Sequence, residues 1–68
     1  MKNKVKELRE EMNISQELLA QKLNISRQSV ISIEKSKYKP SLVLAFKFSK
    51  IFGKKIEEIF FPTDEELN

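Results

Sequence analysis

The side chains best suited to recognise another molecule stand together in residues 27 to 35. The outer face of the helix predicted there lacks the Glu and Lys that usually cover a solvated helix. It carries instead a guanidinium, an amide, hydroxyls and a branched alkyl group: Arg27, Gln28, Ser29, Ile31 and Ser32. Side chains of these types can read the edges of nucleic-acid bases. Taken singly, each residue is equally consistent with a solvated surface. Whether they form a binding site therefore depends on the helices that position them.

Catalytic chemistry has few candidate groups in the chain. With no cysteine and no histidine among 68 residues, the protein has no thiolate nucleophile, no imidazole base, no disulfide and none of the usual zinc ligands. The carboxylates cluster near the C-terminus, away from apolar residues that would raise their pKa. We therefore expect no enzymatic activity, no catalytic residue, no metal site and no cofactor.

Charge is divided unevenly along the sequence. The first 56 residues carry all 13 Lys and Arg against 5 acidic residues, for a net charge of +8, whereas the last 12 residues have a net charge of −5. A basic body suggests a polyanionic partner, either nucleic acid or an anionic membrane surface. A solvated Lys-rich surface explains the charge equally well. The membrane role is disfavoured, because apolar and basic residues do not segregate onto one long amphipathic helix.

One Gly and two Pro predict a chain that is mostly helical, with short turns. The predicted N-caps are Ser15, Ser26 and Ser41, and the predicted stops are Gly53 and Pro62. Together with the apolar spacing, they place helices at residues 3–12, 16–24, 27–35, 42–52 and 56–61.

The length allows one small domain. We expect it to span residues 1–62, with residues 63–68 forming a short, frayed acidic tail. No apolar run approaches the length of a membrane span, and the first residues do not resemble a signal peptide. We therefore expect a cytoplasmic protein.

Residues 16–35 have the spacing of a helix-turn-helix, because two short capped helices are joined by only three residues. Counting from Gln16, the fifth residue is Ala20, which is small enough to let the next helix cross closely. The ninth is Asn24, which tolerates positive φ in a tight turn. The positions that must be buried between the two helices are all apolar: Leu19, Leu23, Ile25, Val30 and Ile33.

Three stretches carry a resemblance to a known family: SQELLA at 15–20, ISRQSV at 25–30 and IEKSKYKPSL at 33–42. From about residue 5 to residue 60 the chain resembles the Cro/C1-type helix-turn-helix family, also called the XRE family. It is most similar to the small, single-domain regulators of that family. The resemblance implies an all-α, five-helix, lambda-repressor-like DNA-binding domain. It also implies a transcriptional regulator that is usually dimeric on double-stranded DNA.

The resemblance assigns roles around the recognition helix, residues 27–35. It implies that Arg27, Gln28 and Ser32 read bases. Chemically, Arg27 suits O6 and N7 of guanine, Gln28 suits N6 and N7 of adenine, and the methyl groups of Ile31 suit thymine. The residues expected to contact phosphates are Gln16, Ser29, Lys35, Lys37 and Tyr38.

Arg9 and Glu34 match a family pair that forms an internal salt bridge, and the resemblance implies a structural role for both. A lone acid on a basic DNA-facing surface would repel phosphate, which also favours the bridge. Asn24 and Ser36 stand where the family often has Gly, so both must adopt a turn conformation that Gly takes more readily. We expect a slightly altered loop after the recognition helix and an intact fold.

Helix 42–52 has more apolar residues than one buried stripe requires. Its inward period is predicted to be Leu42, Ala45, Phe48, Ser49 and Phe52, which leaves Val43, Leu44, Phe46 and Ile51. Large leftover apolar residues suggest an interface, and we expect a dimer contact that includes Leu44, Ile51, Phe60 and Phe61. The alternative is that so small a domain uses all its aromatic residues in one core.

The leading functional hypothesis is a sequence-specific, double-stranded DNA-binding regulator. In its simplest form it is a dimeric repressor that reads a pseudo-palindromic operator through the major groove. The alternative is an antitoxin or phage-type control protein, which binds a protein partner and represses its own operon. A protein-interaction module without DNA binding is a further possibility, although the basic outer face opposes it. We expect no small-molecule ligand domain, because 68 residues leave no room for one beside the helix-turn-helix domain.

Overall fold

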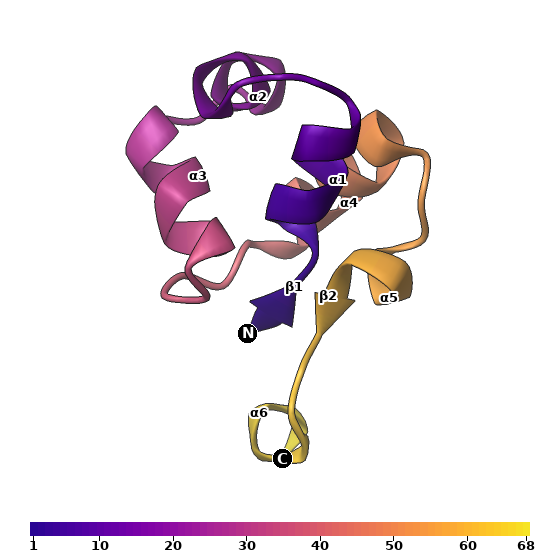
Figure 1. The fold of residues 1–68 in the computed structure, drawn as a ribbon. Helices are drawn as coiled ribbons and strands as arrows, with labels where there is room; N and C mark the ends of the chain where they lie inside the picture. Colours follow the sequence, from indigo (N-terminus) through magenta and orange to yellow (C-terminus); the bar gives the residue numbers. More distant parts are fainter.

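The computed structural model describes residues 1–68 (Figure 1). Its elements follow in the order β1 (Lys2–Asn3), α1 (Val5–Glu11), α2 (Gln16–Leu23), α3 (Arg27–Glu34), α4 (Leu42–Phe52), α5 (Ile56–Ile59), β2 (Phe60–Phe61) and α6 (Asp64–Leu67). The all-α prediction is therefore confirmed, with a two-residue strand pair as an addition. None of the helices has the length and apolar character needed to cross a bilayer.

One hydrophobic core holds the first five helices together. Its buried members come from every element between α1 and β2: Val5, Leu19, Ala20, Leu23, Val30, Ile33, Leu44, Ala45, Phe48, Ile59 and Phe60. The Phe48 ring lies at the centre, with ring centroids 6.0 Å from Phe52 and 5.4 Å from Phe60. No polar or charged residue belongs to this set of eleven. The helices are short, so their stability depends on this shared burial.

Serine caps begin the helices where the sequence predicted them. The hydroxyl oxygens of Ser15, Ser26 and Ser41 each accept a hydrogen bond from the backbone amide three residues ahead. Each cap satisfies one of the amides that a helix start leaves without a partner. These three predictions are confirmed.

Each of the first four helices is followed by a residue with left-handed backbone: Asn13, Asn24, Ser36 and Gly53. The amide of the next residue donates back to the carbonyl five positions earlier, in the pairs 14→9, 25→20, 37→32 and 54→49. This bond is the mark of a Schellman-type helix end. Ser36 therefore occupies, at φ 62°, a conformation that an L-amino acid with a side chain adopts at an energetic cost.

The two ends of the domain pair as strands, which the sequence reading missed. Lys2 lies opposite Phe61 and Asn3 opposite Phe60 in an antiparallel ribbon. Helix α1 consequently begins at Val5, not at residue 3, and α5 ends at Ile59, not at residue 61. The reason is that this pairing joins residues almost 60 positions apart, so no local pattern announces it.

The inward face of α4 was predicted correctly for Ala45 and Phe48 but wrongly for Leu42 and Leu44. Leu42 is 71% exposed, whereas Leu44 is only 7% exposed and belongs to the core. Apolar residues make up most of this helix and occur on more than one of its faces, so the helical period fits more than one phase. Leu18 of α2 is also apolar and yet 39% exposed.

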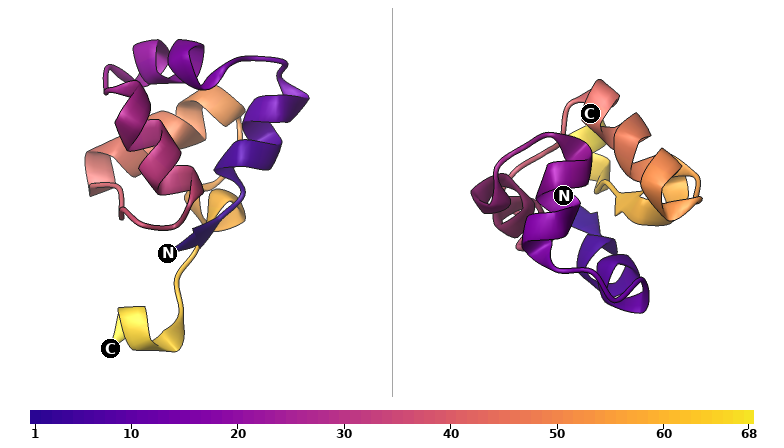
Figure 2. Two further views of the ribbon diagram at one scale, coloured as in Figure 1. Left: turned by 60° about the vertical axis from the view of Figure 1, so that its left-hand side comes forward. Right: turned by 90° about the horizontal axis from the view of Figure 1, so that it is seen from above.

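Residues 63–68 are not frayed, contrary to expectation. Thr63 Oγ1 accepts from the Glu66 amide, and Glu66 Oε1 accepts from the Thr63 amide, which closes a capping box around α6. Glu66 Oε2 also lies 3.4 Å from Lys39 Nζ and 3.5 Å from the Met1 amino group. Helix α6 otherwise stands apart from the other helices, below the ribbon (Figures 1 and 2).

Replacing Ser36 by Gly should stabilise the domain. Gly relieves left-handed strain of about 1–2 kcal/mol but loses more entropy on folding, which leaves a net gain of about 0.5–1 kcal/mol. For a domain of this size, the melting temperature should rise by about 2–8 °C, measured by circular dichroism.

Gly53→Ser is the matched reverse substitution and should lower the melting temperature by a similar amount. Gly53 has φ 63°, and no atom lies within 4 Å of the position that a Cβ would occupy, so backbone strain alone is added. A Ser36→Gly variant that melts at or below the wild-type temperature would contradict the strain at residue 36.

The order of α6 should depend on pH through Glu66. The hydrogen bond from the Thr63 amide, helped by Lys39, lowers the pKa of Glu66 below its usual value. A lowered carboxyl pKa stabilises the folded form above the ordinary Glu pKa of about 4.3, and this contribution disappears as the pH falls through the folded-state pKa. Amide NMR signals of residues 64–67 should therefore move toward random-coil positions in acid.

A Glu66→Gln variant should lack this acid transition, whereas Glu65→Gln should retain it, because Glu65 is exposed. An identical acid response in wild type and Glu66→Gln would show that another group controls α6.

Candidate nucleic-acid interface

Helix α3 presents the predicted base-reading side chains on its solvent face. Val30 and Ile33 point into the core with no exposed surface, which fixes the rotation of the helix. Arg27 and Gln28 are then exposed, whereas the predicted contacts Ser29, Ile31 and Ser32 are half-buried. The structure therefore places all five on the accessible side of one short helix, near the edge of the domain (Figure 1).

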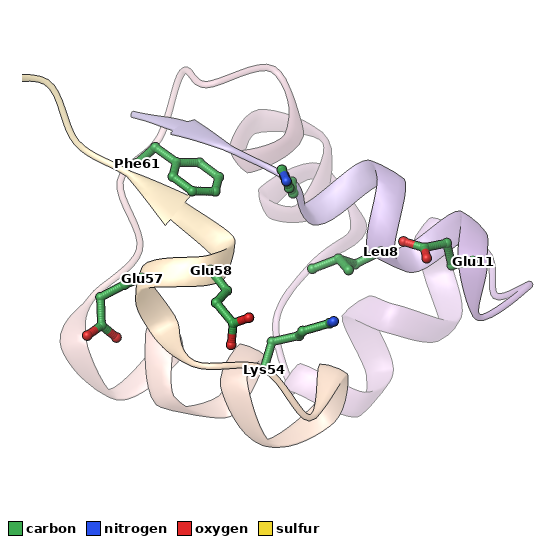
Figure 3. Close-up of a pocket in the computed structure, with 7 residues that line it drawn as sticks. Leu8, Glu11, Lys54, Glu57, Glu58 and Phe61 are labelled. Carbon is green, nitrogen blue, oxygen red and sulfur yellow. The ribbon is translucent and has the colours of Figure 1, made fainter.

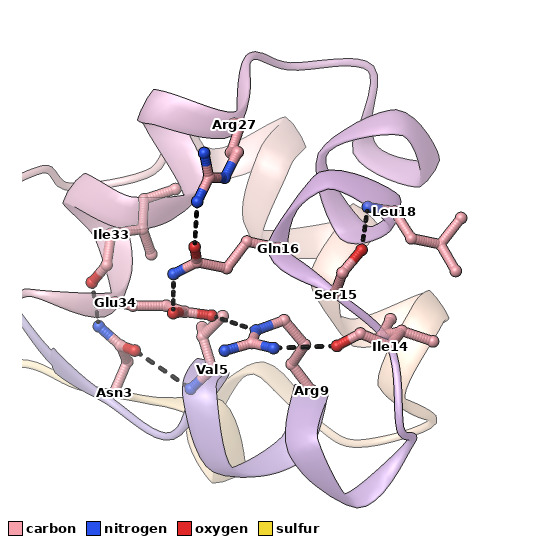
Figure 4. Close-up of polar contacts among 10 residues, drawn as sticks. All are labelled: Asn3, Val5, Arg9, Ile14, Ser15, Gln16, Leu18, Arg27, Ile33 and Glu34. Carbon is pink, nitrogen blue, oxygen red and sulfur yellow. Dashed lines mark hydrogen bonds and ion pairs between the residues drawn. The ribbon is translucent and has the colours of Figure 1, made fainter.

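A chain of polar contacts ties this helix to α1 and α2 (Figure 4). Arg9 Nε donates to Glu34 Oε2 at 2.7 Å, so these residues form the ion pair that the sequence suggested. Arg9 also donates from Nη1 to the Ile14 carbonyl at 2.9 Å. The side chains of Arg9 and Glu34 are only 11% and 4% exposed, so the pair is a buried structural junction.

Gln16 extends the junction to the surface. Its Nε2 donates to Glu34 Oε1 at 3.0 Å, and its Oε1 accepts from Arg27 Nη2 at 3.5 Å. The predicted phosphate-contacting glutamine is thus in contact with the predicted base-reading arginine (Figure 4). Gln16 remains partly exposed at the start of α2.

Asn3 is a positioning residue that the sequence reading missed. Its Nδ2 donates to the Ile33 carbonyl at 2.8 Å, near the end of α3, and its Oδ1 accepts from the Val5 amide at 3.1 Å. One side chain therefore satisfies the first backbone amide of α1 and holds α3 at the same time. The available signal was an Asn at the start of the helix predicted at 3–12, where a side-chain oxygen can accept from a free backbone amide.

Basic side chains surround the outer face of α3. Lys35, Lys37 and Tyr38, all predicted to contact phosphates, are exposed at the end of α3 and in the loop after it. Lys35 also lines a shallow hollow with Gln16, Ile31, Glu34 and Lys6. Lys6 of α1 is a cation of this surface that the sequence reading did not single out. Because Glu34 is buried and paired, the surface that a polyanion would meet is positive.

The predicted dimer contacts do not form one surface. Leu44 and Phe60 are 7% and 4% exposed within the single chain, so their assignment to an interface was wrong: they fill the core. Ile51 is half-buried. Phe61 is 37% exposed and points into a hollow between α1 and α5, with Lys4 Nζ 5.6 Å from its ring centre (Figure 3).

Comparisons with known proteins agree with this geometry. A helix-turn-helix family model matches residues 5–59, which is most of the chain. An uncharacterized HTH-type transcriptional regulator of Methanocaldococcus jannaschii is 59% identical over 66 residues, which cover 97% of this chain and 100% of that protein. Another from Archaeoglobus fulgidus is 43% identical over 67 residues, covering 98% and 94% of the two chains. The regulator YgzD of Bacillus subtilis is 49% identical over 65 residues, covering 96% and 98%.

The matched span includes the capped α2–turn–α3 unit, the exposed face of α3 and the Arg9–Glu34 junction. Both the spacing of these features and the relatives therefore lead to the same conclusion: the chain belongs to the Cro/C1-type helix-turn-helix family of DNA-binding transcriptional regulators, with the all-α, lambda-repressor-like fold.

Proposed function

We propose that the protein is a sequence-specific repressor that binds a pseudo-palindromic operator as a dimer. The observation that supports this best is the outer face of α3, where directional hydrogen-bonding groups are exposed on a helix whose rotation the core fixes. A helix of this size fits the major groove of B-DNA. We place the DNA-binding unit in residues 1–62 and treat α6 as an appendage.

In this proposal, specificity comes from four residues of α3. Arg27 pairs with guanine through O6 and N7, Gln28 pairs with adenine through N6 and N7, and Ile31 meets a thymine methyl group. Ser32 lies one residue further along the same face and offers a hydroxyl to either kind of base edge.

Contacts to phosphate give register and affinity without sequence information. We assign them to residues that flank α3 or lie at its rim: Gln16, Ser29, Lys35, Lys37 and Tyr38. Their exposed or half-buried side chains lie beside the base-reading face, as described above.

A dimer is proposed because one recognition helix reads too few base pairs to select a site in a genome. Two copies related by a two-fold axis read half-sites about 34 Å apart. Of the residues expected at the interface, Ile51 and Phe61 keep exposed surface and remain our candidates. Repression then follows from occupying a promoter.

The antitoxin or phage-type alternative has one supporting observation. The outward face of α4 exposes three apolar side chains, Leu42, Val43 and Phe46, by 71%, 67% and 59%. An apolar patch on so small a domain is typical of a protein-binding surface. This surface lies on a helix other than the recognition helix, so partner binding and DNA binding are compatible.

Selection of bound duplexes from a random DNA pool at about 150 mM salt tests specific recognition. We expect an enriched pseudo-palindrome. Arg27→Ala and Gln28→Ala should each degrade one position per half-site, because each bidentate contact contributes about 1–3 kcal/mol of discrimination. Gln21→Ala, an exposed glutamine of α2, is the matched control and should leave the motif unchanged. Binding that fades with salt without any enriched sequence would refute the proposal.

Salt dependence tests the phosphate contacts. If six or more phosphates are neutralised, affinity should fall about a thousandfold or more between 50 and 200 mM salt. Lys37→Ala should weaken binding to all sequences and reduce the slope by about one counterion. Lys54→Ala, an exposed lysine beyond α4, should change neither the affinity nor the slope.

Sedimentation of two exposed-residue variants locates the dimer contact. Phe61→Glu should give monomers, because the proposed interface would lose an aromatic ring and would have to desolvate a carboxylate in its place. Phe46→Glu should stay dimeric. If Phe46→Glu is monomeric and Phe61→Glu is dimeric, the interface lies on α4 instead. If both variants remain dimeric, neither surface forms the interface.

A further inference from the structure

We propose that Glu34 is a positioning residue for base recognition, in addition to its structural role. Through the side-chain amide of Gln16, its carboxylate determines which atoms face Arg27. The inference rests on the proposed function, in which Arg27 reads a base. It concerns how this chain prepares Arg27 for that contact.

The first step is the bonding of the Glu34 carboxylate. Both oxygens have partners: Oε2 accepts from Arg9 at 2.7 Å and Oε1 accepts from Gln16 at 3.0 Å. An ionised carboxylate can only accept hydrogen bonds. At 4% side-chain exposure, Glu34 is also held in one place. It therefore always presents an acceptor to Gln16.

The second step is the polarity of the Gln16 amide. This group has a donor end, Nε2, and an acceptor end, Oε1. Because Glu34 takes the donor end, the acceptor end must face the other way. Arg27 Nη2 lies there, 3.5 Å from Gln16 Oε1 (Figure 4). The position beside residue 27 is thus an acceptor, which suits a guanidinium.

The third step is the effect on Arg27. This side chain is long and exposed, so ordering it on a base has an entropic cost. An acceptor near its guanidinium favours conformations at the start of α3, while the long contact leaves the side chain free to reach DNA. Gln16 Nε2 keeps a second proton, which is available to a phosphate oxygen. One amide can therefore connect the phosphate contact with the base contact.

We call the chain of contacts Glu34–Gln16–Arg27 the relay. Glu34→Gln tests this relay with little change in the shape of the side chain. The new amide can still accept from Arg9 through its oxygen, but its NH₂ group donates to Gln16 Oε1. Gln16 then turns its own NH₂ group toward Arg27 and no longer attracts it. We expect discrimination to fall about tenfold at the half-site position that Arg27→Ala degrades, with other positions preserved.

The double variant separates positioning from general damage. In an Arg27→Ala background, Glu34→Gln should cause no further loss of discrimination, because the guanidinium that Gln16 would orient is already absent. Gln16→Met should give the same position-specific loss of discrimination, together with a uniform loss of affinity for all sequences because the phosphate contact of Gln16 is also removed. A loss spread over all positions, or an equal loss with and without Arg27, would overturn the proposal.

The free protein supplies a readout that does not depend on DNA. In ¹⁵N NMR spectra, one Gln16 side-chain amide proton of the wild type should be shifted downfield and exchange slowly, and this signature should disappear in Glu34→Gln. Gln28 is the internal control, since its amide has no protein partner in the structure. If Gln16 shows no such signature, the relay is wrong. If it does but no DNA sequence is preferred, the proposed function fails while the amide orientation stands.

Discussion

The arrangement of the half of the protein that we propose to face DNA depends on one buried negative charge. A carboxylate removed from water is strongly unfavourable unless it is paired and hydrogen-bonded. Glu34 meets this requirement only where Arg9 of α1 and Gln16 of α2 approach the end of α3 together. The crossing of three helices is thereby restricted more sharply than apolar packing alone would restrict it. The same charge, withdrawn from the surface, leaves the outer face of α3 basic.

Features with local causes were predictable from the sequence. Ser26 begins α3 and Asn24 ends α2, because a hydroxyl next to free amides and an amide residue in left-handed backbone each act within a few residues. The exposed positions of Arg27 and Gln28 follow from the helical period once Val30 and Ile33 are taken as buried. The candidate site was accessible to prediction because it lies on one such unit.

Features with distant causes were not predictable in the same way. The rotation of α4, which buries Leu44 and exposes Leu42, is decided by what packs against it, since apolar residues occupy more than one face of the helix. Phe60 and Phe61 leave the helix for a strand because of a partner at the opposite end of the chain. The hydrogen bond from Asn3 Nδ2 to the Ile33 carbonyl likewise reaches an element 30 positions away. In each case the deciding group is far away in the sequence.

The pairing of β1 with β2 joins the two ends of the domain, and it affects the order in which the domain folds. Pairing residues 2–3 with residues 60–61 closes a loop of nearly the whole chain, which costs conformational entropy. This cost is smaller once the helices between the two strands have formed and packed. The β1–β2 ribbon should therefore form late in folding, after the hydrophobic core has packed. Only then can the Asn3 side chain donate its hydrogen bond to the Ile33 carbonyl. The proposed recognition helix, α3, reaches its final fixed position only when the two ends of the chain have met.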